Sequence, residues 1–241
     1  MSSITSHRKH RVHSEGHKLG RHNWIRAGVL GASDGVVSIT ALLLGVLSAK
    51  ASLNTLWLTG LSAIVAGAFS MAIGEYVSVA SQKDIENANI AKETWELETE
   101  ADDELIELKN IYKARGLDDA LALDVAKAMT QHNALEAHLR DELGMSDIEA
   151  TNPFQAAYVS FIAFSLGGSA PFALSLFSRN VYDSITARVI PVVIIGVIAL
   201  AILGYTSARL GGAPVKRALI RIMTGGIAAF VISVALGASI G

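Results

Sequence analysis

The fold is decided by residues 58–109, in which an apolar segment, LTGLSAIVAGAFSMAIGEYVSVA (58–80), leads into IENANIAKETWELETEADDELIELK (85–109). Neither proline nor glycine occurs between Ser81 and Lys109, and good helix formers fill the run. The pattern predicts one continuous helix of about 50 residues, roughly 75 Å long at 1.5 Å per residue. A bilayer core takes up only about 30 Å of that length. We therefore expect the second half of the helix to stand in water.

The water-exposed half of this predicted helix carries a stripe of carboxylates. Its members follow each other at spacings of three or four residues and fall within about 80° on one helix face: Glu93, Glu96, Glu100, Glu104 and Glu107. Acid pairs four residues apart destabilise a helix by a few tenths of a kcal/mol each, roughly, and a bound cation would relieve that cost. The stripe is therefore a candidate metal site. The alternative is a solvated acidic face beside an apolar contact stripe.

The composition is that of a membrane protein. Of 241 residues, 51% are hydrophobic and 17% are charged, and the mean hydropathy is +0.41. Absence of cysteine excludes disulfides, thiolate metal sites and cysteine catalysis. We expect an all-α membrane protein that is not an enzyme. Five segments are long and apolar enough to span: 27–49, 57–80, 154–177, 188–210 and 217–240.

Charge is strongly segregated along the chain. Residues 82–150 hold 18 acidic and 7 basic side chains, whereas the remainder holds 4 acidic and 13 basic ones. The predicted domains are a basic tail (1–26) containing five histidines, two transmembrane helices (27–81), an acidic module (82–150) and three further transmembrane helices (151–241). The tail histidines are either weak metal ligands or simply part of a basic tail.

Two shorter helices are predicted in the acidic module after its long first helix. Residues 119–131 and 134–144 have helical patterns, with Gly116 as a C-cap and Asp118 as the next N-cap. The last of these helices carries His138 and Glu142 four residues apart, on one face. If the three helices fold back on one another, these two side chains face the acidic stripe.

The basic segments predict how the chain is oriented in the membrane. The tail and the loop at 209–221, which carries four basic residues, lie on the same side if there are five spans, whereas the loop after the first span holds only Lys50. By the positive-inside rule, the N-terminus and the acidic module are cytoplasmic. The predicted fold is thus five transmembrane helices, the second extended into a cytoplasmic three-helix acidic module that binds metal.

Three polar side chains inside the spans are candidates for a transport pathway. Asp34 lies within the first apolar run, where a charge at the helix centre costs about 2.5–3.5 kcal/mol on insertion scales. Met71 and Glu75 lie one turn apart in the second span. The alternative for Asp34 is an acid near a helix end that reaches water or caps a neighbour.

Three motifs resemble those of the vacuolar iron transporter family of iron and manganese carriers: GASDGVVS (31–38), GAFSMAIGEYVSV (67–79) and ELIELKNIYKARGL (104–117). The resemblance covers nearly the whole chain from about Arg26. It implies a homodimer of five-span subunits with the pathway at their interface, and a cytoplasmic metal-binding domain on the second span. It also implies export of Fe²⁺ or Mn²⁺ from the cytosol in exchange for protons.

The resemblance also assigns roles to individual residues. Asp34 and Met71 match pathway residues of the family, and Glu75 stands in the same Gly-Glu motif. Four carboxylates of the stripe match the two Glu-x-x-Glu pairs of the family's metal-binding domain, and Glu142 matches the acid on its third helix. Glu100 has no counterpart in these motifs and is a candidate only because it lies in the helical stripe. His138 departs from the plant pattern Met-Met-x-x-Glu and would offer a nitrogen in place of a thioether. The matched pairs are Glu93, Glu96, Glu104 and Glu107.

Carboxylates with one imidazole suit Fe²⁺ or Mn²⁺ as transported ions, with Zn²⁺ and Co²⁺ as further candidates. No prosthetic group is expected, and the partners are these ions, protons, the lipid bilayer and a second copy of the chain, with no nucleic acid. Neighbouring carboxylates raise one another's pKa, so protons compete with metal. The expected location is the plasma (inner) membrane of a bacterium or the vacuolar membrane of a eukaryote.

Two other function classes fit less well. A membrane-anchored di-iron oxidase of the ferritin type needs Glu-x-x-His pairs on two helices, and the sequence contains no Glu-x-x-His. An acidic scaffold or a metal-buffering protein without transport leaves Asp34, Met71 and Glu75 without a purpose.

Overall fold

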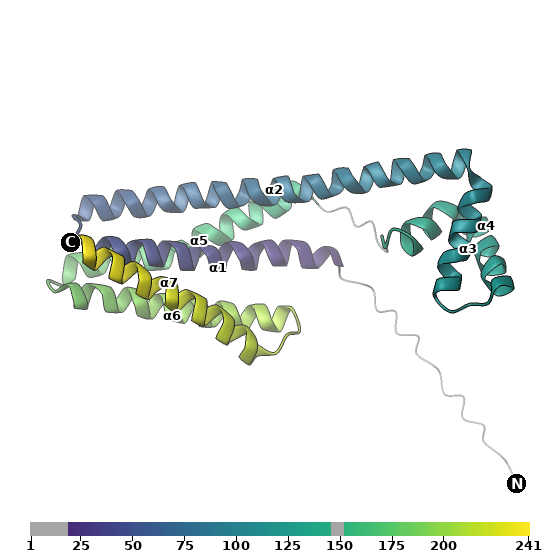
Figure 1. Ribbon diagram of the computed structural model, residues 1–241. Coiled ribbons are helices and arrows are strands. Elements are labelled where there is room, and N and C mark those ends of the chain that lie inside the picture. Colours follow the sequence, from purple (N-terminus) through teal and green to yellow (C-terminus); the bar gives the residue numbers. More distant parts are fainter. Residues whose placement is uncertain (1–18, 146–151) are drawn as a thin grey trace, which may run out of the picture.

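The computed structural model describes residues 19–145 and 152–241, and all regular structure in them is helical (Figure 1). The seven helices of this part of the chain are α1 (Leu19–Ser48), α2 (Leu53–Thr99), α3 (Ala101–Ala114), α4 (Asp119–Asp141), α5 (Pro153–Val181), α6 (Ile185–Leu210) and α7 (Val215–Ile240). Five of them, α1, α2, α5, α6 and α7, are long and apolar enough to cross a membrane. The predicted all-α membrane architecture with five spans is therefore confirmed in its coarse form.

Helix α1 is the centre of the membrane bundle. It packs against α2, α5, α6 and α7, and its buried Leu43 and Leu44 belong to a core shared with Phe164, Val192 and Leu200. Small residues permit the closest of these contacts, because they let two backbones approach. A Cβ on Gly31 would lie 2.7 Å from the carbonyl oxygen of Ser160, so the glycine face of α1 is filled by α5 of the same chain.

Helix α2 continues well beyond the bundle. Its 47 residues include the second span and then project away from α1 and α5 toward α3 and α4 (Figure 1). No break occurs at the predicted boundary between residues 81 and 82, so the acidic part is joined to the membrane span by continuous helix. The Ser52 side chain caps its start by accepting a hydrogen bond from the Thr55 N–H.

The prediction that this helix runs unbroken to Lys109 is wrong. Glu100 adopts φ −133° and ψ 37°, and α3 turns away sharply from α2 at this residue (Figure 1). The bend loses little backbone hydrogen bonding, because the Glu100 N–H still donates to Glu96 and its carbonyl accepts from Asp103 and Glu104. Packing drives it: the bend lets Leu108 and Tyr112 of α3 become buried against α4. Helix propensity describes single residues and cannot predict a bend that depends on packing between two helices.

Helix α4 consists of two segments, as the sequence predicted. Asn133 has non-helical angles (φ −165°, ψ 97°), and its side-chain oxygen accepts a hydrogen bond from the Glu136 N–H as a cap of the second segment. The predicted caps before α4 are also confirmed, with Gly116 at φ 103° and the Asp118 carboxylate accepting from two N–H groups. The kink allows the second segment to pass close to α2.

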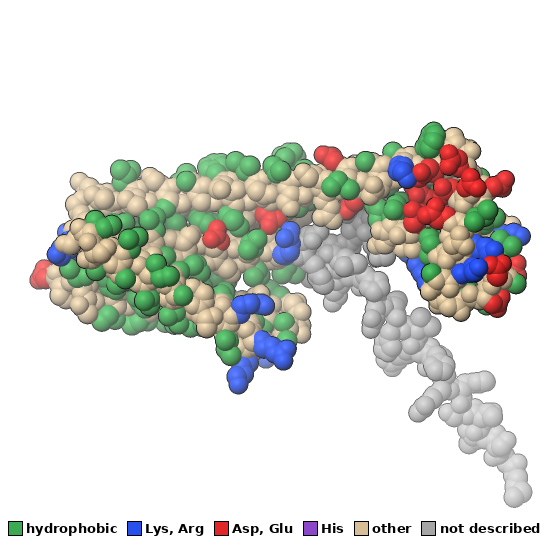
Figure 2. Space-filling model, viewed as in Figure 1, with side chains coloured by type: hydrophobic (Ala, Val, Ile, Leu, Met, Phe, Trp, Pro, Cys, Tyr) green, Lys and Arg blue, Asp and Glu red, His purple; other side chains and the backbone are tan. Residues whose placement is uncertain are grey.

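Charged side chains are segregated in space as they are in sequence. Figure 2 shows acidic side chains gathered at the α2–α3 end of the molecule, and basic ones at the turn between α6 and α7. That turn and the start of α1 lie at the end of the bundle that faces α3 and α4 (Figure 1). The five tail histidines lie outside the part whose side chains the structure describes.

Candidate metal centre

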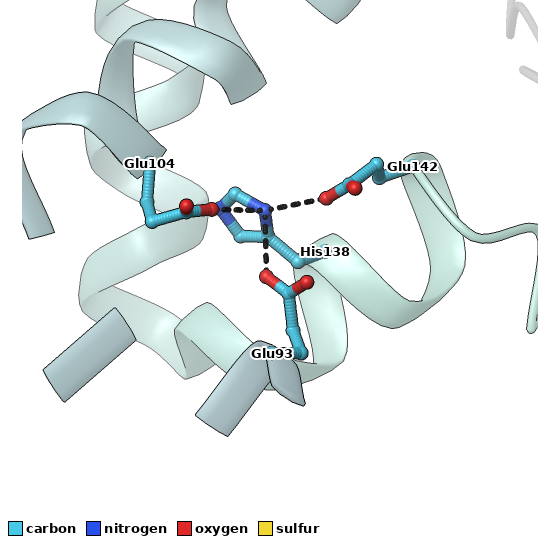
Figure 3. A group of neighbouring side chains, drawn as sticks. All are labelled: Glu93, Glu104, His138 and Glu142. Atoms are coloured by element: carbon cyan, nitrogen blue, oxygen red, sulfur yellow. Dashed lines mark hydrogen bonds and ion pairs between the residues drawn. The ribbon is translucent and has the colours of Figure 1, made fainter. Parts of the chain in front are cut away.

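Four side chains from three helices converge on one point beside the α2–α3 bend (Figure 3). Glu93 comes from α2, Glu104 from α3 and His138 from the second segment of α4, while Glu142 is the residue that caps the C-terminus of α4. The His138 Nδ1 atom lies 3.1 Å from Glu93 Oε1, 3.4 Å from Glu104 Oε2 and 3.1 Å from Glu142 Oε2. All four potential ligand atoms lie within 4.8 Å of one another.

This cluster is buried and electrostatically unbalanced. The side chains of His138 and Glu93 are 0% and 3% exposed, and that of Glu142 is 25% exposed. The pKa of Glu93 is raised to about 7, first by burial and then by the neighbouring Glu142 carboxylate, while His138 opposes the shift. Burial is also the main cause of the raised pKa of Glu104. Three carboxylates held this close favour either protons or a cation.

Hydrogen bonding within the described residues does not satisfy the cluster. Only the Glu142 contact to His138 has hydrogen-bond geometry, while Glu93 Oε1 and His138 Nε2 are buried without a hydrogen-bond partner. One imidazole N–H serves one acceptor well, yet three carboxylate oxygens point at the same nitrogen. An ion held between these oxygens and a deprotonated Nδ1 would satisfy the three carboxylates and that nitrogen. Oxygen ligands with one imidazole suit Mn²⁺ and Fe²⁺, and also accept Zn²⁺.

A second group of residues holds the end of α4 in place. Asp141 lies between His138 and Glu142 in the sequence. Its carboxylate accepts hydrogen bonds from the hydroxyl of Tyr112 in α3, at 2.8 Å, and from Nη1 of Arg115, the residue that caps α3, at 2.6 Å. Arg140 donates to the same carboxylate, and these hydrogen bonds hold the pKa of Asp141 well below its usual range. The network fixes the distance between the α3 and α4 ligands.

We expect Asp141→Asn to weaken metal binding about tenfold, which is typical when a group that orients a ligand is changed. The isosteric change keeps the shape but removes the charge that attracts Arg115 and Arg140. Titration calorimetry with Mn²⁺ on the purified full chain measures the effect. Asp119→Asn is the matched control, because Asp119 is also paired with two cations, Lys109 and Lys113, but lies away from the cluster. Equal losses in both variants would assign the effect to net charge alone.

Three predicted ligands of the acidic stripe lie outside the four-residue cluster. Glu96 pairs with Lys92 at 2.7 Å, Glu100 is exposed at the bend, and Glu107 is exposed on α3. Glu96 and Glu107 still lie near enough for their charge to raise the pKa of Glu104. Their roles as ligands stay predictions.

The three membrane candidates have different surroundings. Asp34 is exposed on the surface of α1 in the single chain, and Met71 is half-buried against the bundle core. Glu75 is buried, 6% exposed, and its Oε2 atom lies 3.5 Å from Arg26 Nη2. Sequence reasoning missed Arg26 as a partner because it was assigned to the basic tail. A buried acid in a span requires a partner, and Arg26, at the edge of the first apolar run, supplies it.

Comparison with known proteins agrees with the motifs. A family model described as "VIT family" matches residues 25–238, which is nearly the whole described chain. The chain belongs to the VIT family.

Relatives of this VIT-family chain span most of its length. It is 40% identical over 228 residues to a vacuolar iron transporter of Acanthamoeba castellanii, covering 94% of this chain and 83% of that protein. It is 31% identical to vacuolar iron transporter homolog 2.1 of Arabidopsis thaliana, covering 92% and 84% of the two chains. A rice protein, vacuolar iron transporter homolog 5, is 34% identical over 90% of this chain and 80% of its own length. The resemblance found in the motifs is thereby confirmed.

Proposed function

We propose that this protein transports divalent Fe²⁺, Mn²⁺ or both out of the cytosol in exchange for protons. Family membership indicates metal transport, and relatives that match along most of the chain are named iron transporters. The observation that carries the proposal is the buried cluster of Glu93, Glu104, His138 and Glu142, whose donor atoms fit a transition ion. In this proposal α3, α4 and the projecting end of α2 collect ions on the cytosolic side.

The membrane pathway is proposed to use Asp34, Met71 and Glu75. A carboxylate exposed on the side of a span is costly in lipid, so the exposure of Asp34 in the single chain supports a cover made by a second copy. A homodimer would place Asp34 in a shared, hydrated path. The Met71 thioether is a weak, soft ligand that favours transition ions over Ca²⁺ and Mg²⁺.

Proton exchange follows from the competition between protons and metal for the same carboxylates. Glu93 has a pKa of about 7 in the empty cluster, so a substantial fraction of it is protonated at neutral pH. An arriving cation displaces this proton because ligands bind metal in their deprotonated form. On the far side of the membrane, protons that bind the carboxylates of the pathway can displace the metal ion and release it.

Transport by the purified protein in sealed liposomes tests the proposal. We expect uptake of Fe²⁺ and Mn²⁺, measured with a trapped metal-sensitive dye, together with alkalinisation of a lumen that starts acidic. Ca²⁺ and Mg²⁺ serve as controls and should not be taken up at comparable rates. Metal binding without flux, in liposomes whose protein is shown to be folded, would instead identify a metal-buffering membrane protein.

A further inference from the structure

A basic groove lies on the side of the membrane bundle, away from the acidic cluster. It is a cavity of about 760 Å³ between the start of α1, the end of α6 and the start of α7. Arg26 and Arg221 contribute cationic groups to its wall, and Ser33 and Ser207 contribute hydroxyls. Most of the remaining wall is apolar. Of these polar residues, only Arg26 forms an ion pair with a residue of the proposed pathway, Glu75, and none belongs to the metal cluster.

The position of the groove places it at the membrane surface. Gly211 ends α6 and Val215 begins α7, so the groove lies at the level where these spans reach water. Figure 2 shows basic side chains at this turn and none of the acidic ones that cover the α2–α3 end. The wall thus combines the two arginines with apolar side chains such as Val29, Leu30 and Ile222.

The two arginines have free hydrogen-bonding capacity. Arg221 forms no ion pair with any described residue, and Arg26 makes only one contact of 3.5 Å to Glu75 while its side chain stays 58% exposed. A guanidinium carries five N–H donors in a planar fork that matches phosphate oxygens. Each arginine can thus contact a phosphate, and Arg26 can do so without leaving Glu75.

We propose that this groove binds one anionic phospholipid, with its phosphate between Arg26 and Arg221 and an acyl chain along the apolar wall. Basic pockets between membrane helices at the cytoplasmic surface are the kind of site that holds anionic headgroups. A soluble phosphate would use the arginines but would leave the apolar wall in contact with water, which favours a lipid as the occupant. Because Arg26 also contacts Glu75, the bound lipid touches the same side chain that partners the buried acid of the second span.

Native mass spectrometry of the full-length protein in mild detergent tests this inference. Phosphatidylglycerol and phosphatidylcholine of identical acyl chains are titrated in separate samples. We expect one phosphatidylglycerol per chain to bind with clear preference over phosphatidylcholine. Each arginine near an anionic headgroup contributes about fivefold in affinity, so Arg221→Gln should weaken phosphatidylglycerol about fivefold. It should weaken phosphatidylcholine less, because the choline ammonium offsets the charge of the phosphate in that lipid. Arg221→Lys should retain most of the preference, since it keeps the charge.

Arg217→Gln is the matched control, because it removes one charge from the first part of the same helix, α7, at a residue outside the groove wall. Equal weakening by Arg217→Gln and Arg221→Gln would show diffuse attraction and overturn the site. Equal binding of the two lipids by the unaltered protein would also overturn it, without any need for a variant. Inorganic phosphate binding as tightly as phosphatidylglycerol would show that the lipid is not the recognised occupant. None of these readouts involves metal, so failure of the lipid site and failure of the proposed transport are distinguishable.

Discussion

Asp34→Asn is expected to reduce Fe²⁺ and Mn²⁺ flux about 100-fold or more, since loss of even an outer group around a metal costs 10–100-fold. Asparagine keeps the size and hydrogen bonding of the side chain but removes the charge that attracts a cation. Asp34 is exposed on α1 and is not part of the bundle core. The substitution should therefore leave folding intact, or even favour insertion, since a charge in a span is costly.

Flux and thermal stability must be measured on the same preparations of this variant. Met71→Leu is a useful companion, because it conserves volume and should cost less than about 1.5 kcal/mol in stability. We expect it to slow transport of Fe²⁺ with little change in melting temperature. If both residues serve only packing, expression and melting temperature fall while flux per folded molecule stays constant. Full transport by Asp34→Asn would exclude Asp34 as the pathway ligand.

The double variant Glu93→Gln/Glu104→Gln is expected to lose metal affinity by about 100-fold or more. Both glutamines keep the volume of the side chain, but an amide is a poorer ligand than a carboxylate for Fe²⁺ and Mn²⁺. The metal-free protein should become more stable, because two buried carboxylates beside Glu142 are replaced by neutral groups. Lower affinity together with a higher metal-free melting temperature is a combination that simple misfolding cannot produce.

Titration calorimetry with Mn²⁺ and a thermal melt in chelator supply the two readouts. Glu86→Gln/Glu98→Gln is the matched control: it also replaces two glutamates, both on the acidic part of α2, without touching the cluster. Native affinity in the Glu93→Gln/Glu104→Gln protein would place the metal elsewhere, and the exposed Glu100 and Glu107 of the predicted stripe would be the next residues to replace.

The pH dependence of the same samples has a definite sign. The pKa of Glu93 is about 7 in the folded, metal-free chain, above its ordinary value of 4.5. The folded state therefore binds more protons than the unfolded state between these values, and stability in chelator should fall as pH rises from about 4.5 through 7. Metal affinity should change in the opposite direction and strengthen over this range, because protons compete for Glu93. A Glu93→Gln protein should lose this component of both profiles.

The sequence predicted the five spans because each is a long apolar run, and it predicted several helix ends from local caps. Asn152 before Pro153, and Gly116 before Asp118, are local signals that need no knowledge of the rest of the chain. The bend at Glu100 had no such signal. It depends on the burial of Leu108 and Tyr112 against α4, a contact between segments that periodicity in one helix cannot reveal.

The same limit explains the outcome for the candidate site. Helical spacing grouped five glutamates on one face, but the bend separates Glu93 and Glu104 onto different helices and brings them together again at His138. His138 and Glu142 were found because their four-residue spacing is local. Arg26 was missed because its ion pair with Glu75 joins α1 to α2 across 49 residues.

Because α2 is unbroken, it sets a fixed distance between the buried Glu75 of the membrane span and Glu93 of the four-residue cluster. Glu75 and Glu93 are 18 residues apart on one continuous helix, which corresponds to about 27 Å. An ion bound at the cluster would therefore lie far outside ligand distance of Glu75, because metal–oxygen bonds are only about 2–2.6 Å long. The helix therefore holds the two carboxylates at a fixed separation. In the proposed transport, an ion bound at Glu93 would thus have to leave the cluster completely before Glu75 could bind it.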